Sequence, residues 1–259
     1  MMHRARKRFG QNFLQDASVI YSIVSLINPS PDAHILEIGP GLGALTKPLL
    51  SNVNQLDLLE IDRDLVAYWR QQNLQGLNVI EGDALQFDFR EWAKSHPQDG
   101  ALCKVVGNLP YNISSPLLFH LVSAADYINE QVFMLQAEVV ERMVAVAGSS
   151  DFSRLSVMLQ ARYYMEQVLD VPPEAFDPQP KVNSAVVRMI PRSDFDLTDV
   201  QWSALEKVVA AAFSQRRKML RTNLQDFSQQ LTLANEELRA RAQDISVDRY
   251  IEWAKVLAA

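Results

Sequence analysis

The residues best suited to chemistry form the tetrapeptide Asn108-Leu109-Pro110-Tyr111, which directly follows the apolar run 102–107. The oxygen of the Asn108 amide and a nearby backbone carbonyl can accept both hydrogens of an exocyclic amine on a planar base, which makes the amine nitrogen nucleophilic. Pro110 fixes its own φ and leaves carbonyls that no local helix uses, and the Tyr111 ring can stack on the base. An ordinary turn after a strand, with a surface tyrosine, would account for the same residues.

A glycine-rich loop lies earlier in the chain, in Glu37-Ile38-Gly39-Pro40-Gly41-Leu42-Gly43, between an expected strand and an expected helix. Glycines at such a turn let the backbone approach a ligand closely. Gly39, Gly41 and Ala44 also satisfy the dinucleotide-binding pattern, and Glu60 stands where a carboxylate can grip ribose hydroxyls. The loop indicates a nucleotide site, but it does not separate an oxidoreductase from a methyltransferase, and a tight turn without a ligand is the structural alternative.

Two further residues favour a methyltransferase. Asp83 ends the third expected strand, within Glu81-Gly82-Asp83-Ala84, where its carboxylate can accept a hydrogen bond from an adenine amine or simply cap a turn. Asn108 ends the fourth expected strand. Ligands of open α/β sheets bind beyond the carboxyl ends of the strands, so we expect the glycine-rich loop, Glu60, Asp83 and Asn108 to share one site.

Hydrophobic periodicity predicts alternating strands and helices up to about residue 190. The expected strands span 35–38, 56–60, 78–80, 103–107, 132–135, 168–171 and 185–190. The expected helices span 18–26, a segment from about 44, 64–72, 116–122 with Ser114 or Ser115 as its cap, and 138–146. This alternation predicts a mostly parallel sheet covered on both faces, and the last two strands, joined by the proline-rich loop 172–180, suggest an antiparallel addition at one edge.

The pattern changes beyond Pro191, where only helical signals follow, ending in an amphipathic segment after a Ser246 cap. The sequence therefore predicts two domains. The first, over 1–190, is an α/β domain with a basic N-terminal arm, and the second, over 191–259, is small and entirely helical.

The composition excludes several classes of protein. Of the 259 residues, 48% are apolar and 22% are charged, as in ordinary soluble globular proteins. No apolar stretch approaches the ~20 residues of a membrane helix. The single cysteine, Cys103, excludes a disulfide framework and fits a reducing cytoplasm. One cysteine and four scattered histidines give no metal-ligand spacing, so we expect no metal.

The charge is unevenly distributed. A net charge of −6 argues against a uniformly basic nucleic-acid binder. Two clusters nevertheless contain only basic charges: Arg4, Arg6, Lys7 and Arg8, and then Arg216, Arg217, Lys218 and Arg221. A solvated face is the usual role of such clusters, but two of them in an acidic chain favour contact with the phosphates of a nucleic acid.

Taken together, these motifs resemble the adenine-N6 dimethyltransferases of ribosomal RNA, in particular the bacterial small-subunit members, and the resemblance covers essentially the whole chain. Besides the segments above, it rests on Gly10-Gln11-Asn12-Phe13-Leu14, Glu60-Ile61-Asp62, Gly107 to Ser114, Met134-Leu135-Gln136, Arg154-Leu155-Ser156-Val157, Pro172 to Phe176, and Ala212 to Lys218. The last two blocks and their order are quite specific.

The resemblance implies a Rossmann-like class I methyltransferase fold, with S-adenosylmethionine as methyl donor and S-adenosylhomocysteine as product. By matching motifs, the donor pocket would be lined by Asn12, Leu14, Gly39, Gly41, Glu60, Ile61, Asp83, Ala84 and Asn108. The catalytic group would be Asn108, Leu109, Pro110, Tyr111 and Phe176. Tyr111 and Phe176 would stack on opposite faces of a flipped-out adenine, although Phe176 could instead anchor the proline-rich loop in the core.

The family dimethylates two adjacent adenines in a hairpin loop near the 3′ end of small-subunit rRNA. The resemblance implies this activity, a role in small-subunit biogenesis, a cytoplasmic location and the small ribosomal subunit as partner. The basic clusters would bind phosphates of that RNA, and the helical domain would widen the footprint. We expect a monomer without an obligate protein partner and without membrane association.

The chain departs from the family pattern at two places. Phe152 and Ser153 stand where the family commonly has Tyr and Gly, which leaves the fold untouched but affects the fine geometry of that loop. Asp177 and Gln179 stand where apolar residues or prolines are frequent, while Phe176 is retained.

Four alternatives compete with this interpretation. Relatives that dimethylate a large-subunit rRNA adenine share the chemistry but usually have a more basic body, and the 216–218 block favours the small subunit. A DNA adenine methyltransferase usually needs a dedicated base-reading domain, whereas the segment after Pro191 is helical and small. A non-catalytic ribosome-assembly factor would have no use for a donor pocket. A nicotinamide oxidoreductase would need a His, Lys or Tyr placed for the hydride acceptor, and we find none.

Overall fold

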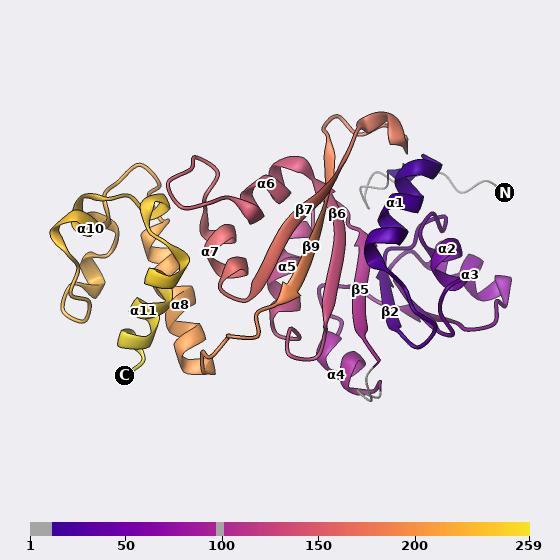
Figure 1. The fold of residues 1–259 in the computed structure, drawn as a ribbon, viewed down its shortest axis with the longest axis horizontal. Coiled ribbons are helices and arrows are strands. Elements are labelled where there is room, and N and C mark those ends of the chain that lie inside the picture. The colour runs from indigo at the N-terminus through magenta and orange to yellow at the C-terminus, as the bar shows by residue number, and fades with distance from the viewer. Residues whose placement is uncertain (1–11, 97–100) are drawn as a thin grey trace. The chain divides into compact units, whose positions relative to one another are not determined.

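The structure of the protein is a computed structural model in which residues 12–96 and 101–259 are described. The described residues form two compact units (Figure 1). Unit 1 contains the chain up to Val140 together with Glu166–Pro191, and unit 2 contains Glu141–Met165 together with Arg192–Ala259. The sequence assigned residues 141–165 to the α/β domain, whereas here they group with the C-terminal helices.

Unit 1 is built around a sheet with the strand order β4-β3-β2-β5-β6-β9-β7. The strands are β2 (His34–Ile38), β3 (Leu56–Glu60), β4 (Leu77–Glu81), β5 (Cys103–Asn108), β6 (Glu130–Gln136), β7 (Tyr163–Val171) and β9 (Ser184–Pro191). The pairs β2–β3, β2–β5, β3–β4 and β5–β6 are parallel, and β9 runs antiparallel to β6. The predicted seven-stranded, mostly parallel sheet with an antiparallel addition is thereby confirmed.

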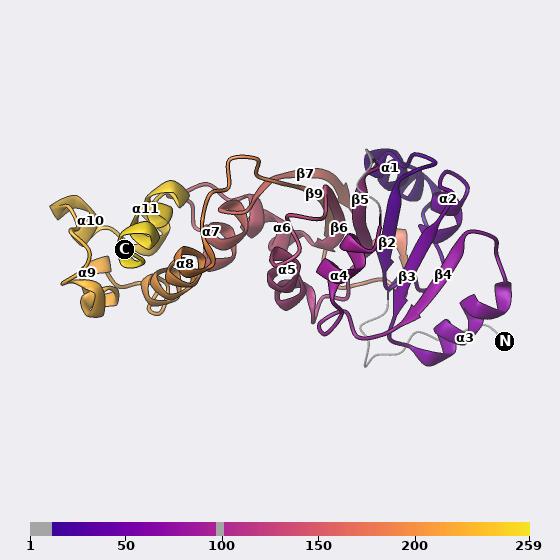
Figure 2. The same ribbon diagram turned by 90° about the horizontal axis from the view of Figure 1, so that it is seen from below.

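Helices cover the sheet on both faces, with α1 and α2 on one side and α4 and α5 on the other (Figure 2). The central strands are buried nearly throughout, which explains their continuous apolar runs. The helices up to residue 144 are α1 (Ala17–Ile27), α2 (Thr46–Leu50), α3 (Arg63–Gln72), α4 (Phe89–Lys94), α5 (Ser114–Val122) and α6 (Ala137–Val144), and the division between the two units falls within α6, at Glu141. Helix α4 was not predicted, because six residues carry too little periodicity.

The expected serine cap of α5 is wrong. The helix begins at Ser114 itself, with Ile113 at the cap position and no side-chain cap. The hydroxyl of Ser114 instead donates a 3.0 Å hydrogen bond to the Pro110 carbonyl, which the amide of Ile113 also approaches at 3.1 Å. The serine therefore closes the turn that precedes the helix, and this turn contains Pro110 and Tyr111, the last two residues of the tetrapeptide.

A second, two-stranded sheet joins the N-terminal segment to the proline-rich loop. Strand β1 (Phe13–Leu14) pairs antiparallel with β8 (Phe176–Asp177), which follows a short 3₁₀ helix, Pro173–Ala175. The amides of Gln15 and Asp16 extend the pairing by donating to the Ala175 carbonyl at 2.8 and 3.3 Å. Asp16 then caps α1 by accepting from the amides of Ser18 and Val19.

Unit 2 is helical. Its remaining helices are α7 (Arg154–Gln160), α8 (Asp199–Ala212), α9 (Leu220–Asn223), α10 (Asn235–Arg239) and α11 (Val247–Leu257), with 3₁₀ turns at Gln225–Phe227 and Ala242–Asp244. Helix α8 begins at a capping box formed by Thr198 and Gln201. Helix α11 begins at the predicted Ser246 cap and buries Tyr250 and Trp253.

Candidate active site at the carboxyl ends of the strands

A cavity of about 260 Å³ opens at the carboxyl ends of strands β2, β3, β4 and β5. This size lies close to the lower end of ordinary small-molecule sites, roughly 300–1,000 Å³. Every residue predicted to line the donor pocket lines this cavity: Asn12, Leu14, Gly39, Gly41, Glu60, Ile61, Asp83, Ala84 and Asn108. Leu109, Pro110 and Tyr111 line it as well. The parallel sheet thus brings together side chains that are far apart in the sequence.

The glycine-rich loop forms the floor of the cavity and requires its glycines for different reasons. Gly39, Gly41 and Gly43 all have φ between +54° and +88°, a region that L-residues rarely adopt. A Cβ on Gly43 would lie 2.4 Å from the ring of Trp69, whose indole nitrogen donates to the Gly41 carbonyl at 3.0 Å. A Cβ on Gly39 would meet nothing within 4 Å, so that glycine borders open space where a ligand can approach the backbone.

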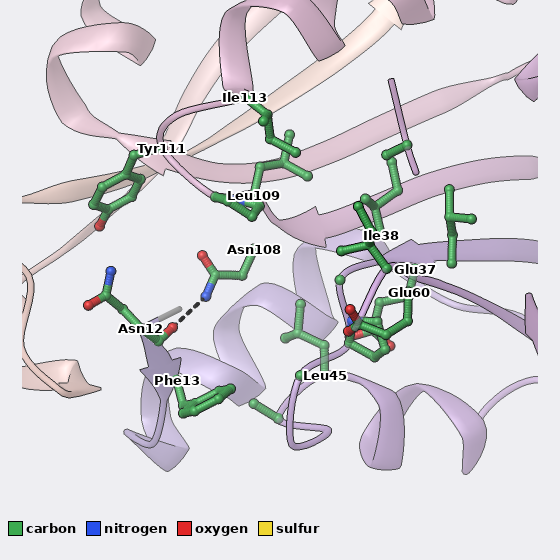
Figure 3. A pocket seen from close by; sticks show the side chains of 18 of the residues that line it. Asn12, Phe13, Glu37, Ile38, Leu45, Glu60, Asn108, Leu109, Tyr111 and Ile113 are labelled. Carbon is green, nitrogen blue, oxygen red and sulfur yellow. Dashed lines mark hydrogen bonds between the residues drawn. The ribbon is translucent and has the colours of Figure 1, made fainter. Parts of the chain in front are cut away.

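Two carboxylates, Glu37 and Glu60, lie side by side at one end of the cavity (Figure 3). Glu37 is buried at the end of β2 and accepts a 2.7 Å hydrogen bond from the Thr46 hydroxyl. Burial raises the pKa of Glu37 to about 8, with a smaller opposing effect from the Thr46 hydrogen bond and a further increase from the charge of Glu60. Glu37 is therefore protonated near neutral pH unless a cation binds beside it.

Glu60 ends β3, is 5% exposed, and is held by backbone amides. Its Oε1 accepts from the amide of Asp62 at 2.8 Å. Burial raises the pKa of Glu60, while hydrogen bonds from the amides of Asp62, Ile61 and Gly41 act in the opposite direction. These amides fix the carboxylate in the wall of the cavity, where it can accept from hydroxyl groups.

Asp83 follows β4 and lies in the cavity wall beside Ala84. Its Oδ1 accepts from the amide of Leu85 at 2.9 Å. The turn-forming role considered from the sequence is therefore present, and it orients the carboxylate of a residue that also borders the cavity.

Asn108 is oriented by a segment nearly a hundred residues away. Its amide nitrogen donates a 3.2 Å hydrogen bond to the backbone carbonyl of Asn12. Figure 3 shows the amide oxygen pointing away from Asn12, on the side of Tyr111. The Leu109 amide donates to the Met134 carbonyl at 3.1 Å, which ties the tetrapeptide to the neighbouring strand β6.

Phe176, predicted to stack on the target base, occupies a different environment. It is 3% exposed in β8, opposite Leu14, and belongs to the main hydrophobic cluster. Among the described residues, it is not part of the lining of the cavity, whereas Tyr111 is. This position fits the alternative that Phe176 anchors the proline-rich loop, and its stacking role stays a prediction.

Of the two basic clusters, the structure describes only the second. Arg4, Arg6, Lys7 and Arg8 lie outside the described residues. Arg216, Arg217, Lys218 and Arg221 are all exposed in unit 2, between α8 and α9 or at the start of α9. Arg216 donates a hydrogen bond to the Ser150 carbonyl, in the loop where Phe152 and Ser153 depart from the family pattern.

Three residues at the site went unrecognised at the sequence level. Phe13 lines the cavity, and a Cβ on Gly41 would approach its ring to 3.2 Å. Thr46 binds Glu37, and Ser184 binds the Tyr111 hydroxyl at 2.8 Å. Phe13 could have been inferred from its place between Asn12 and Leu14, but a hydroxyl that becomes buried only through the fold leaves no local signal.

Within residues 12–96 and 101–259, no helix combines the length and apolar character that a bilayer requires. The same residues contain no group of three or more His, Cys, Asp or Glu side chains arranged to hold a metal ion.

The fold and the cavity together define a Rossmann-like methyltransferase. Residues 2–259 match the family described as ribosomal RNA adenine dimethylase, and the chain belongs to this family. The enzyme class predicted from the sequence, an rRNA adenine-N6 dimethyltransferase, is thereby confirmed.

Relatives of high identity span the whole chain. A Burkholderia lata protein named ribosomal RNA small subunit methyltransferase A is 55% identical over 99% of this chain and 95% of its own length. A Cupriavidus necator protein of the same name is 54% identical, covering 98% of this chain and 93% of that protein.

Two solved structures share the fold at lower identity. A dimethyladenosine transferase from Plasmodium falciparum superimposes with a TM-score of 0.77 at 24% identity, covering 93% of this chain and 95% of that one. The 23S rRNA methyltransferase ErmE superimposes with a TM-score of 0.69 at 24% identity, covering 96% of this chain and 100% of that one.

Proposed function

We propose that this protein transfers methyl groups from S-adenosylmethionine to N6 of two adjacent adenines in the 3′-terminal hairpin loop of small-subunit rRNA. The orientation of Asn108 carries the proposal. Because the Asn12 carbonyl takes the amide nitrogen, the amide oxygen is left as an acceptor for an amine. The names of the full-length relatives support the small subunit as the substrate.

The residues of the cavity fit the donor. Gly39 borders open space for close backbone approach, Glu60 would accept from ribose hydroxyls, and Asp83 would accept from the adenine amine of the donor. Asn12, Leu14, Gly41, Ile61 and Ala84 complete the wall of this site. When bound, S-adenosylmethionine supplies an electrophilic methyl group on a sulfonium. Glu37, which also lines the cavity, would offer a carboxyl that can ionise beside a positive charge of the donor.

The tetrapeptide holds the target amine. Asn108 Oδ1 accepts one amine hydrogen and a backbone carbonyl accepts the other, which localises the nitrogen lone pair. The Pro110 carbonyl already accepts two hydrogen bonds, from the Ile113 amide and the Ser114 hydroxyl, and this favours the Leu109 carbonyl as the second acceptor. Tyr111 stacks on one face of the flipped-out base, and Phe176 would need to leave the core to cover the other.

Rate enhancement then comes from proximity and orientation of the amine toward the methyl group. No general base is required, because the amine becomes strongly acidic once it is methylated and water or the Leu109 carbonyl can take its proton. The protein needs only to hold the base, to prevent the amine from reaching the methyl group in an unproductive orientation, and to accommodate the monomethylated amine for a second transfer.

The rest of the chain provides the RNA footprint. Arg216, Arg217, Lys218 and Arg221 contact rRNA phosphates, together with the N-terminal cluster Arg4, Arg6, Lys7 and Arg8. We further propose that the protein acts in the cytoplasm as a monomer during small-subunit biogenesis, without a metal cofactor.

The proposal is tested by the transfer of labelled methyl groups to small ribosomal subunits that lack this modification. We expect about four methyl groups per subunit, recovered as dimethyladenosine, strongly reduced transfer by Asn108→Ala, and weak transfer to naked rRNA. Transfer only to large-subunit RNA would contradict the substrate. Tight subunit binding without any transfer would instead indicate an assembly factor.

A further inference from the structure

The hydroxyl of Tyr111 is bound by a residue that lies outside the tetrapeptide and outside every motif described above. The Tyr111 oxygen and Ser184 Oγ are 2.8 Å apart. Ser184 is the first residue of β9 and is 1% exposed. Tyr111 is half-buried at the cavity, so this hydrogen bond runs from a residue of the site into the interior of unit 1.

Ser184 is fixed in place by the backbone on both sides. It pairs with Gln136 in the antiparallel ladder between β6 and β9. The carbonyl of the preceding residue, Asn183, accepts a 2.9 Å hydrogen bond from the Ala137 amide. The serine hydroxyl is therefore presented by a rigid part of the sheet rather than by a loop, which is what precise positioning of a partner requires.

The other contacts of the tetrapeptide restrain its backbone but not its ring. The Leu109 amide binds the Met134 carbonyl, and the Pro110 carbonyl accepts from Ile113 and Ser114. Rotation of the Tyr111 ring about its side-chain bonds is limited, among the described polar contacts, by the hydrogen bond to Ser184. Burial raises the pKa of Tyr111, so the phenol stays neutral and the hydrogen bond persists over the working pH range.

We propose that Ser184 is a positioning residue for methyl transfer, which holds the ring of Tyr111 at the tilt needed to stack on the target adenine. The inference rests on the proposed function, in which Tyr111 forms one face of the base site. Stacking geometry is directional, and an error in the tilt of the ring is transmitted to the amine that Asn108 must orient.

The second methylation depends on this ring more than the first. An unmodified adenine amine offers two hydrogens, one to Asn108 Oδ1 and one to a backbone carbonyl, and both help to align it. The monomethylated amine offers a single hydrogen. Its alignment therefore relies more heavily on the stacking surface, and a loosened Tyr111 should slow the second transfer more than the first.

The test compares Ser184→Ala, Tyr111→Phe and the double variant in single-turnover methylation of small subunits that lack the modification. We expect each single variant to slow the second transfer about 3- to 10-fold, as loss of one hydrogen bond allows, so that monomethyladenosine accumulates. The double variant should be no slower than either single one, because both remove the same bond. Donor affinity should be unchanged, and Ser184→Thr, which keeps a hydroxyl, should restore the wild-type product ratio.

Ser156→Ala is the matched control for a merely structural effect. Ser156 is also fully buried and donates to a backbone carbonyl, that of Arg142 in unit 2. It should lower the melting temperature without changing the ratio of monomethyl to dimethyl product.

Two results would overturn the inference while leaving the proposed function intact. One is an active Ser184→Ala with the wild-type product ratio, and the other is additive losses in the double variant. A wild-type protein that transfers no methyl group to small subunits would overturn both proposals.

Discussion

The cavity of unit 1 and the exposed basic segment of unit 2 solve two different recognition problems. At the cavity, polar side chains are buried or half-buried and bound to specific partners, as the buried Glu37 is by Thr46 at 2.7 Å and the half-buried Asn108 by Asn12 at 3.2 Å. In the basic segment, Arg216, Arg217 and Lys218 are exposed to solvent. The first arrangement fixes atoms in place, and the second presents charge.

This difference follows from what each ligand demands. Transfer to one particular nitrogen needs the reacting groups placed to within a fraction of an ångström. Phosphates of a folded RNA are repeated and highly charged, so mobile cations can bind them without fixed geometry. Substitutions at the cavity should therefore change rates and donor affinity, whereas substitutions in the basic segment should change the salt dependence of binding.

The largest effect is expected at Asn108. Asn108→Ala removes the acceptor for the target amine, and we expect the methyl-transfer rate to fall at least about 100-fold, the cost of a lost orientation. Because Asn108 also lines the donor cavity, donor affinity should fall too, but by less than the transfer rate. Single-turnover transfer combined with calorimetry of donor binding separates the two quantities.

Asn78→Ala is the control for that experiment, since Asn78 donates to Asp57 at the opposite end of the sheet. It should leave the transfer rate within about twofold, as expected for a surface substitution. Equal losses in both variants would mean that Asn108 acts through the fold and not through the amine.

The effect expected from Glu37 is on protein stability and not on the transfer rate: the free energy of unfolding should change by a few kcal/mol, on the order of 1.4 kcal/mol per pKa unit, as the pH is varied. Its pKa rises from 4.5 to about 8 on folding, so the folded state holds a proton that the unfolded state has released between these values. The contribution of this proton on Glu37 to the free energy of unfolding is therefore full below about pH 4.5, and it is lost as the pH rises through about 8.

Glu37→Gln removes this titration. Without donor, we expect the variant to gain stability relative to wild type between about pH 5 and pH 9, as measured by denaturant unfolding at each pH. The raised pKa of Glu60 leaves a residual trend of the same sign in both proteins. A stability difference independent of pH would show that Glu37 is already ionised in the folded protein.

The sequence was sufficient for the part of the site that comes from strand ends. A polar residue or a glycine directly after an apolar run marks the end of a strand, as at Glu60, Asp83 and Asn108. Parallel strands bring those ends to one edge, so Gly39, Glu60, Asp83 and Asn108 line one cavity, whereas Asn12 and Leu14 reach it from the N-terminal segment. Their individual roles stay predictions.

The features of the site and fold that the sequence did not predict depend on contacts between residues far apart in the chain, which no local pattern encodes. Tyr111 and Ser184 are 73 residues apart, and Asn108 and Asn12 are 96 apart. The strands β1 and β8 have two residues each, too few for any alternation to be recognised. The burial of Phe176 follows from that pairing, which is why its hydrophobic character fitted both a stacking role and a core role.

The next effect in size is expected at Glu60. Glu60→Gln keeps the shape but weakens the acceptance of hydrogen bonds from ribose hydroxyls, and we expect donor affinity to fall about 10- to 100-fold, as for hydrogen bonds to a charged group. The transfer rate at saturating donor should fall less. Glu81→Gln, an exposed carboxylate at the end of β4 that pairs with Arg63, is the control and should leave calorimetric donor affinity unchanged.

The smallest effect is expected in the basic segment, where it should appear in the binding of small subunits. With Arg216, Arg217 and Lys218 all changed to Gln, the plot of log Kd for small subunits against log salt should become shallower by about 2, or roughly 0.7 per lost phosphate contact. Affinity at moderate salt should fall about tenfold, while the transfer rate at saturating subunit stays the same.

Arg63→Gln with Arg70→Gln is the matched control, because these exposed arginines of unit 1 pair with Glu81. Their loss should leave the salt slope unchanged. If the triple variant instead lost its transfer rate at saturation and kept the wild-type slope, the basic segment would be acting through geometry and not through charge. The two regions would then differ only in exposure, and phosphate binding would have to be assigned to other cations of the chain.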